Sequence, residues 1–483
     1  MINFFRLTTS FKYIILFSLF LIMRIPALLV DFPLLNPSLS WMLVGERLAQ
    51  GYQLYTETWD TTAPFSALFF GLIHLVFGKW YLVHQIIAIF FVFLQALWFN
   101  QILFKANIFH ERTMLPALLY LVMMSIFVDS WVVTPILLAN NFLLLFLRYL
   151  LMQMNEKQRY NATFEIGAYI AIASLFYLPC VTLLLVTYLT FLLYTNSKIR
   201  DYILVLVSFF FTMGIVLLTF YMFNAEYAFY FNYLRPLLLL KIQFYIQFYE
   251  LLLLASVSIL LVILNIFLSP RYRRYNNYQN RTQTVITFWW FISLLSVFLD
   301  YKLSAYSLCL LAIPTAFLLS HLFLQLTHKI MAELVFSFLL AWHLFFTYVS
   351  LYNANLILPF KQLGGVDIPL KIHTEKLLTQ LDKQNLAYKN KKILVLGNNL
   401  SPYMYARLAT PYLNGDLAQT HWQNLNQYNI VLETYSNFEK DMPQVIIDQN
   451  NKINQIFAAL PLLAEKYEKS KNKNIYLLKS TKK

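Results

Sequence analysis

A polar segment that carries two carboxylates and several aromatic rings separates two long apolar runs near the start of the chain. It extends from Asn36 to Pro64 and reads NPSLSWMLVGERLAQGYQLYTETWDTTAP. Glu57 and Asp60 supply carboxylates, which can remove a proton from an acceptor hydroxyl. Tyr55 and Trp59 are aromatic residues suited to a membrane interface and to stacking on sugar rings. We interpret this loop as the place where chemistry on a lipid-borne substrate could happen.

The same loop contains a short amphipathic helical pattern. Trp41, Val44 and Leu48 fall at positions i, i+3 and i+7, which places them on one helical face. Polar residues lie off this face: Ser40, Arg47 and Gln50. Gly51 stands where a helix typically ends. The pattern predicts a short helix that lies in the plane of the lipid headgroups.

The composition indicates an integral membrane protein. Hydrophobic residues make up 59% of the 483 residues and charged residues 12%, whereas a soluble domain carries about 25% charge. Apolar runs of roughly 20 residues recur from Phe11 to Tyr352, each long enough to cross a bilayer. The runs are continuous rather than alternating, which excludes a β-barrel. We therefore predict an all-α polytopic bundle.

The net charge of +14 fits cationic loops at anionic lipid headgroups, so no nucleic-acid partner is expected. The positive-inside rule places the basic clusters between apolar runs in the cytoplasm. The N-terminus, near Arg6 and Lys12, is then also cytoplasmic, and the C-terminal segment lies outside. The region from Ala63 to Phe104 must cross an odd number of times, which gives about 11 to 13 spans. Cys180 and Cys309 lie inside apolar runs and are expected to be buried and unpaired.

The composition changes after the last apolar run, so we predict a membrane domain over residues 1–355, with its first outer loop at 31–63, and a soluble α/β domain over residues 356–483. Four strands are predicted in the second domain: Lys391–Gly397, Asn429–Tyr435, Pro443–Gln449 and Asn474–Ser480. Helical patterns lie between them: Leu370–Lys383, Ser401–Ala409, Ala418–Tyr428 and Asn454–Lys469. The alternation predicts a mainly parallel sheet. The turn after Gly397 lacks phosphate-loop spacing, so no nucleotide cofactor is expected.

Several features together resemble the GT-C glycosyltransferases, and more narrowly the family of protein O-mannosyltransferases and lipid A aminoarabinose transferases. They are a first span, an outer loop with a juxtamembrane helix, an aromatic–acid–x–x–x–Pro phrase (Trp59 to Pro64) and many later spans. The segment TPILLANNFLLLFLRYLL (Thr134–Leu151) looks like the span after the family's second outer acid. DYKLSAYSLCLLAIP (Asp300–Pro314) resembles the family's late Lys-x-x-x-Tyr span. The resemblance implies a lipid-linked sugar donor.

The chain departs from the family at the positions that carry catalysis. The family opens its first outer loop with Asp-Glu, whose aspartate is the base, and this chain has Asn36 and Pro37 there. The second outer aspartate aligns with Asn141. An amide cannot remove a proton from a hydroxyl. Either the base has moved or the fold has lost transferase activity.

Substitute acids are expected near the outer face: Asp31, Glu57, Asp60, Asp129 and Asp300. We take Asp60, Glu57 and Asp129 as catalytic candidates, with Asp60 first because its loop is most like the catalytic one. Substrate-binding candidates are Asn36, Tyr55, Trp59, Asn141, Lys302 and Tyr306, of which Lys302 could hold a lipid phosphate as a point charge. No metal site is expected, although a divalent cation between a diphosphate and the outer acids stays open.

Two functions remain open. In the first, the protein is a hexosyltransferase in a bacterial inner membrane that passes a sugar from a polyprenyl-phosphate donor to an outer-face lipid, glycan or protein. In the second, it is an inactive GT-C-like protein that binds a lipid carrier or serves as a partner in an envelope assembly or secretion machine. A transporter is less favoured, since the sequence has no inverted repeat.

Overall fold

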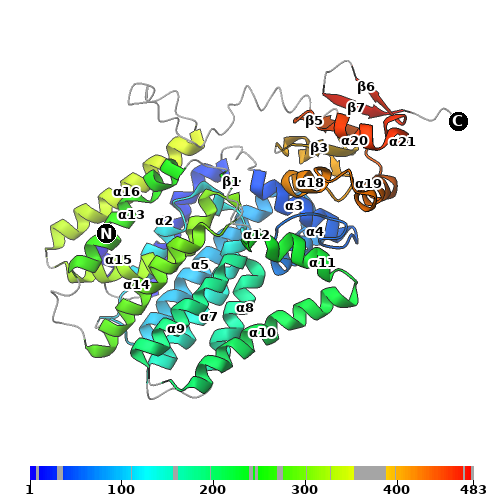
Figure 1. Ribbon diagram of the computed structural model, residues 1–483. Helices are drawn as coiled ribbons and strands as arrows, with labels where there is room; N and C mark the ends of the chain where they lie inside the picture. Colours follow the sequence, from blue (N-terminus) through cyan, green and yellow to red (C-terminus); the bar gives the residue numbers. More distant parts are fainter. Residues whose placement is uncertain are drawn as a thin grey trace. The chain divides into compact units, whose positions relative to one another are not determined.

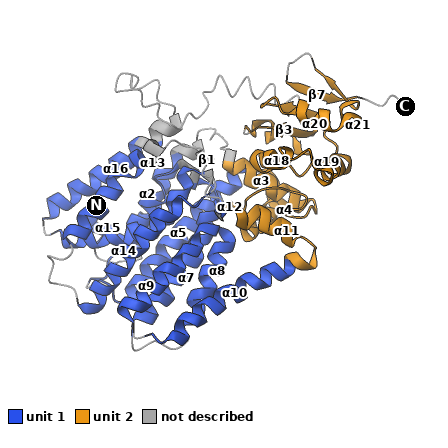
Figure 2. Ribbon diagram, in the orientation of Figure 1, with its two compact units in different colours: residues 1–33, 81–219, 237–372 blue, residues 34–80, 220–236, 373–483 orange. Residues whose placement is uncertain are grey.

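The computed structural model describes residues 1–6, 10–29, 36–109, 111–155, 162–195, 197–238, 243–244, 248–268, 276–300, 302–326, 328–352, 388–397, 399–470 and 474–479. The chain divides into two compact units (Figure 2). Unit 1 contains residues 1–33, 81–219 and 237–372, and unit 2 contains residues 34–80, 220–236 and 373–483.

Unit 1 is almost entirely helical (Figure 1). Its helices are α1 (Ile2–Phe5), α2 (Ser10–Leu29), α5 (Tyr81–Lys105), α6 (Leu115–Met123), α7 (Pro135–Met154), α8 (Ala162–Phe176), α9 (Leu183–Tyr194), most of α10 (Ile199–Met222), α13 (Phe248–Leu268), α14 (Asn277–Val297), α15 (Ala312–Gln325) and α16 (Lys329–Tyr352). Short 3-10 helices are η1 (Val128–Trp131), η3 (Leu178–Thr182) and η6 (Ala305–Leu311). Strands β1 (Gln243–Phe244) and β2 (Lys302–Leu303) pair in parallel.

Four helical segments of the described chain are long and apolar enough to cross a membrane: Tyr81–Lys105, Pro135–Met154, Ile199–Met222 and Ala305–Gln325. Helices suit this environment because a bilayer offers no water to unpaired backbone groups. The predicted polytopic helical bundle is confirmed, and the chain is a multi-pass membrane protein. The total of about 11 to 13 spans stays a prediction. The predicted burial of Cys180 and Cys309 is also confirmed.

Unit 2 begins with the first loop, whose helix is α3 (Asn36–Ala49). The predicted helix and its glycine end are confirmed, since Gly51 follows with φ 88°. The expectation that α3 lies with a polar face toward the headgroups is wrong for two residues, because Ser40 and Arg47 are as buried as the apolar face. Arg47 is covered by the C-terminal domain, where its Nη1 lies 2.7 Å from Asp441 Oδ2, and Ser40 contacts Asp60. Helix α3 also packs closely against α4 (Pro64–Phe77), since a Cβ added to Gly45 would lie 2.6 Å from the Phe70 carbonyl oxygen.

A short helical stretch completes this part of unit 2. It consists of α11 (Glu226–Phe229), the π-helix η4 (Tyr230–Leu234) and the start of α12 (Arg235–Leu238). Its aromatic residues pack around the ring of Tyr55. The loop between α3 and α4 is therefore supported from a segment that is far away in the sequence.

The C-terminal part of unit 2 is the predicted α/β domain, with a five-stranded sheet in the order β4-β3-β5-β7-β6. Its strands are β3 (Lys392–Leu396), β4 (Arg407–Leu408), β5 (Val445–Asp448), β6 (Tyr467–Lys469) and β7 (Ile475–Leu478). Strands β4, β3 and β5 are parallel, whereas β7 and β6 are antiparallel. The predicted strands at β3, β5 and β7 are confirmed.

The helices of this domain are η9 (Ser401–Met404), α18 (Gly415–Trp422), α19 (Tyr428–Lys440), α20 (Ile453–Ala459) and α21 (Pro461–Ala464). The predicted strand Asn429–Tyr435 is wrong, because it forms the first half of α19. The residues that pack inward there recur at helical spacing: Val431, Thr434, Tyr435 and Phe438. In a strand, Leu432 would lie on the same face as the buried Thr434, but it is 48% exposed. Tertiary packing thus overrides β propensity.

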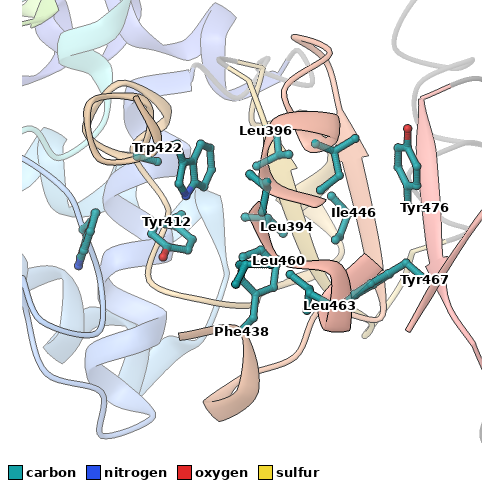
Figure 3. Close-up of a cluster of buried hydrophobic side chains, with 14 residues drawn as sticks. Leu394, Leu396, Tyr412, Trp422, Phe438, Ile446, Leu460, Leu463, Tyr467 and Tyr476 are labelled. Atoms are coloured by element: carbon teal, nitrogen blue, oxygen red, sulfur yellow. The ribbon is translucent and has the colours of Figure 1, made fainter. Parts of the chain in front are cut away.

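Three other expected helices end early, and the one predicted over Ala418–Tyr428 ends at Trp422 as α18. Ser401–Ala409 shortens to η9 and then forms β4, and Asn454–Lys469 breaks at Pro461 before β6. Leu370–Lys383 lies outside the described residues. The core of the domain, drawn in Figure 3, contains Leu394, Tyr412, Trp422 and Ile446. It also contains Trp59 of the first loop.

Candidate functional site

The first loop is shaped by a tight turn around Tyr55. This residue has φ 71°, in the left-handed region that residues other than glycine rarely adopt. Its backbone N–H donates to Thr58 O at 3.0 Å, and its carbonyl accepts from Asn232 Nδ2 at 3.1 Å. Its hydroxyl donates to Thr62 O at 2.7 Å. These three partners therefore hold a strained backbone conformation in place.

The Tyr55 side chain is fully buried. Burial, and then the neighbouring Tyr233 and Asp60, raise the pKa of the Tyr55 hydroxyl well above its usual value. The hydroxyl therefore remains a hydrogen-bond donor at neutral pH. Its ring stacks on Tyr233 with centroids 6.4 Å apart, so protein covers the ring that the sequence offers to a sugar.

Asp60 is the buried carboxylate of the loop, with 2% of its surface exposed. Ser40 Oγ, from α3, donates to its Oδ1 at 3.4 Å. The Thr62 backbone N–H donates to Oδ2 at 3.2 Å, and the Thr62 hydroxyl donates to the same oxygen. Hydroxyl and amide donors around both oxygens suit an ionised carboxylate, which can only accept.

Glu57 has a different environment from Asp60. It is only half-buried, and its Oε2 accepts from the Gln53 backbone N–H at 2.8 Å. This bond closes the turn at the start of the loop. Of the two loop acids, Asp60 is therefore enclosed by protein donors, whereas Glu57 lies at the surface.

Trp59 joins the first loop to the C-terminal domain. Its backbone N–H donates to Pro411 O at 2.7 Å, and its carbonyl accepts from Asn414 N at 3.0 Å. Its ring meets Tyr412 and His421 edge-on, with centroids 5.1 and 4.8 Å apart. The indole that the sequence offers for sugar stacking is here part of a protein core.

The amides of α7 have separate roles within unit 1. Asn141 Nδ2 donates to Leu137 O and Leu138 O of its own helix, at 3.4 and 3.1 Å. Asn140 is fully buried, and its Nδ2 reaches Cys309 O at 3.5 Å, in η6. Of the two amides, Asn140 therefore makes the hydrogen bond to another helical segment.

A second carboxylate cluster lies in unit 1 at the end of α14. Tyr177 hydroxyl and Ser307 Oγ donate to Asp300 Oδ2 at 2.7 and 2.8 Å. Asp300 is half-buried, and Tyr306, next to Ser307, is buried. The late Asp-x-Lys-x-x-x-Tyr segment therefore supplies the acid, while the phenol that donates to it comes from Tyr177, just before η3.

Several predicted site residues have no described side chain. Asn36 begins α3, Asp129 lies in η1 and Lys302 lies in β2, and the structure describes only their backbone. Asp31 lies outside the described residues. Their assigned roles stay predictions.

Arg24 in α2 is a charged residue that we did not single out from the sequence. It is 1% exposed, and its Nη2 donates to Met124 O at 2.8 Å. Its guanidinium carbon lies 5.2 Å from the ring centroids of Phe20 and Trp131. No carboxylate in the described ranges pairs with it. The signal was an arginine inside the first apolar run, because a cation at that position is costly in lipid.

Among the residues that the structure describes, no group of three His, Cys, Asp or Glu side chains is arranged to hold a metal ion.

Residues 61–354 match a protein family described as a family of unknown function, DUF6427. The chain belongs to the DUF6427 family. No curated protein matches it.

The fold of this DUF6427 protein is similar to two solved structures. One is ArnT from Cupriavidus metallidurans bound to undecaprenyl phosphate, with a TM-score of 0.52 and 13% identity over 97% of this chain and 98% of that chain. The other is the Archaeoglobus fulgidus oligosaccharyltransferase in its apo form, with a TM-score of 0.46 and 10% identity over 98% of this chain and 75% of that chain. ArnT is a GT-C glycosyltransferase. The resemblance inferred from the sequence is confirmed at the level of the fold.

Proposed function

We propose that this protein is a membrane glycosyltransferase that takes a sugar from a polyprenyl-phosphate donor and passes it to a lipid, glycan or protein acceptor at the outer face. ArnT, with which it shares a fold over nearly the full length of both chains, was solved with undecaprenyl phosphate. The observation that carries the proposal is Arg24, a buried cation without a described carboxylate partner.

Arg24 would hold the phosphate of the lipid carrier. Its Nε is buried and has no hydrogen-bond partner in the described part of the chain. Among the described residues, its Nη groups donate to the carbonyls of Met124 and Ser130, which do not cancel a full charge. A buried charge without a counter-ion is costly. A phosphate supplies that counter-ion and matches the planar guanidinium. Lys302 is a second candidate for the same phosphate.

Asp60 would be the general base that accepts the proton of the acceptor hydroxyl. Ser40 and Thr62 would hold its carboxylate in one orientation and keep it an acceptor. The strained turn at Tyr55 supports a functional loop, because such conformations cluster at working sites. Glu57 and Asp129 are the other acids proposed for this role. Of the remaining predicted substrate residues, Asn141 and Tyr306 of unit 1 and Asn36 of unit 2 are each proposed to contact substrate, while Tyr55 and Trp59 support the first loop from within the protein.

Two observations favour a second function. Hydrogen bonds within the protein already occupy the carboxylate of Asp60, and the amides Asn36 and Asn141 stand where the family has its acids. In this alternative the protein keeps the lipid carrier but transfers nothing, and it serves as a carrier-binding or assembly partner. Arg24 would have the same role in both functions.

The two functions separate in one experiment on the full chain in lipid nanodiscs. Binding of undecaprenyl phosphate and turnover of an undecaprenyl-phosphate-linked hexose would be measured for wild type, Asp60→Asn and Arg24→Gln. Asp416→Asn, in the first turn of α18, is the control for loss of a carboxylate. If the protein is a transferase, Asp60→Asn should lower turnover about 10²–10⁴-fold and leave the binding of undecaprenyl phosphate intact. Binding that needs Arg24, with no turnover by any variant, would establish the alternative. Unchanged binding in Arg24→Gln would refute both.

A further inference from the structure

Two adjoining cavities follow the C-terminal half of α5 in unit 1. The larger has a volume of about 710 Å³ and the smaller about 340 Å³. Both are lined by Trp98 and Gln101, so they form one elongated groove. The positive-inside rule places this end of α5 in the cytoplasm, which is the opposite side from the proposed transfer reaction.

The larger cavity has an apolar wall. Leu94, Leu97 and Phe104 line it. Leu94 and Phe104 are each 44% exposed. Exposed apolar side chains on a membrane helix face acyl chains, so this part of the groove suits a hydrocarbon chain.

Three basic residues also line the two cavities. Lys105 and Arg148 line the smaller cavity, and Arg112 lines the larger. All three are exposed, and none forms an ion pair with a carboxylate in the part of the chain that the structure describes. Arg112 lies over the Phe104 ring at 4.9 Å, which holds its charge beside the apolar wall. Three such cations around one groove favour an anionic ligand.

Asn100 adds a requirement for a hydrogen-bond donor. It lines the larger cavity and is 8% exposed, and its Oδ1 is buried with no donor within the described residues. A buried acceptor without a donor costs free energy. A hydroxyl of a bound molecule can supply that donor, whereas a phosphate oxygen cannot.

We propose that this groove binds an anionic glycerophospholipid with a hydroxylated headgroup, of the phosphatidylglycerol type. The cations Lys105, Arg148 and Arg112 hold the phosphate, and a headgroup hydroxyl donates to Asn100 Oδ1. An acyl chain lies along Leu94, Leu97 and Phe104. The inference does not depend on the proposed transfer reaction, because neither Arg24 nor Asp60 lines the groove.

The test is native mass spectrometry of the full chain in detergent, titrated with phosphatidylglycerol, phosphatidic acid, phosphatidylcholine and soluble glycerol phosphate. Wild type should bind phosphatidylglycerol most tightly. The double variant Lys105→Gln with Arg148→Gln should weaken that binding at least tenfold, because each charge-assisted hydrogen bond contributes ~1.5–3 kcal/mol. The matched control, Lys198→Gln with Arg200→Gln at the exposed start of α10, should leave it unchanged. Arg148→Lys, which keeps the charge, should retain most of the affinity.

Asn100→Leu should abolish the preference for phosphatidylglycerol over phosphatidic acid while anionic lipid still binds. Equal weakening by the control pair would overturn the proposal, since binding would then follow total charge alone. Glycerol phosphate that binds as tightly as the lipid would also overturn it, since the apolar wall would contribute nothing. The thermal midpoint of each variant shows whether it is folded, and Arg148→Lys keeps the test decisive if the double variant is not.

Discussion

Arg47 Nη1 lies 2.7 Å from Asp441 Oδ2, so a buried ion pair joins the helix of the first loop to a residue 394 positions along the chain. Lys392 Nζ lies 2.7 Å from the other oxygen of the same carboxylate. Arg47 also donates to the carbonyls of Leu408 and Thr410. The first loop and the C-terminal domain therefore share a buried electrostatic contact, and with Trp59 they share a core. Changes in the loop should alter the stability of the domain.

Loss of the Arg47 guanidinium should destabilise unit 2 strongly. Arg47→Gln leaves Asp441 buried with only the partly exposed Lys392, and such a break costs about 3–5 kcal/mol. Lys392→Gln removes a cation whose side chain is 46% exposed, and it should cost less than about 1 kcal/mol. Hydrogen exchange of residues 392–396 in the purified chain would measure both. Similar effects of the two variants would contradict the assignment of the buried pair.

Trp59→Ala should unfold the C-terminal core rather than act on a bound sugar. Removing a buried tryptophan costs about 3–5 kcal/mol, whereas Trp59→Phe keeps much of the contact and should cost less. Exchange of β3 and β5 should rise in the alanine variant. If exchange does not change while hexose transfer is lost, Trp59 has the sugar-stacking role that its position in the sequence suggests.

Gly45→Ala should separate α3 from α4. The added Cβ would lie 2.6 Å from the Phe70 carbonyl oxygen, and this clash is with backbone, which cannot move aside as a flexible side chain can. Overpacking of this kind costs about 1–3 kcal/mol. Gly71→Ala on the facing helix is the matched control, because its nearest neighbour is Leu48 Cβ at 3.4 Å. It should be neutral or slightly stabilising, since alanine favours a helix by about 1 kcal/mol over glycine. Thermal unfolding in detergent measures both, and a Gly45→Ala protein as stable as wild type would rule out the close contact.

Acid should weaken the C-terminal domain through His421. Burial lowers the pKa of this imidazole to about 4, and its ring contacts Trp59 edge-on. The unfolded chain takes up the proton near pH 6.5, whereas the folded chain stays neutral down to about pH 4. The stabilisation is therefore complete above pH 6.5 and is lost as pH falls from 6.5 to 4.

Because His421 is partly exposed, the expected loss is about 1–2 kcal/mol. Unfolding midpoints at pH 7.5 and pH 5 would measure it. His421→Phe should reduce the difference between the two pH values. A pH dependence that the variant leaves intact would assign the effect to other groups.

Several features of this protein follow from local patterns in the sequence. Long apolar runs predict membrane helices because a bilayer accepts little else. The strands at 392–396 and 445–448 follow from short apolar runs between turns, and the helix of the first loop follows from its spacing and its glycine end. These signals depend on neighbours within one or two helical turns. At Asn429–Tyr435 the local pattern predicts a strand, but the segment forms a helix because this buries Thr434 and Phe438.

The roles of the polar residues were decided only by the tertiary structure. Glu57 and Asp60 are both acids of the first loop in the sequence, but only the fold shows that Asp60 is enclosed, because Ser40 of α3 and Thr62 surround it. Trp59 is a surface aromatic in the sequence and a core residue in the fold, because Pro411 and Asn414 pair with its backbone. The Arg24 guanidinium is held by hydrogen bonds to carbonyls about a hundred residues further along the chain. Sequence alone determines which segments are apolar, whereas the partner of each buried charge depends on contacts between distant residues, and these contacts exist only once the chain has folded.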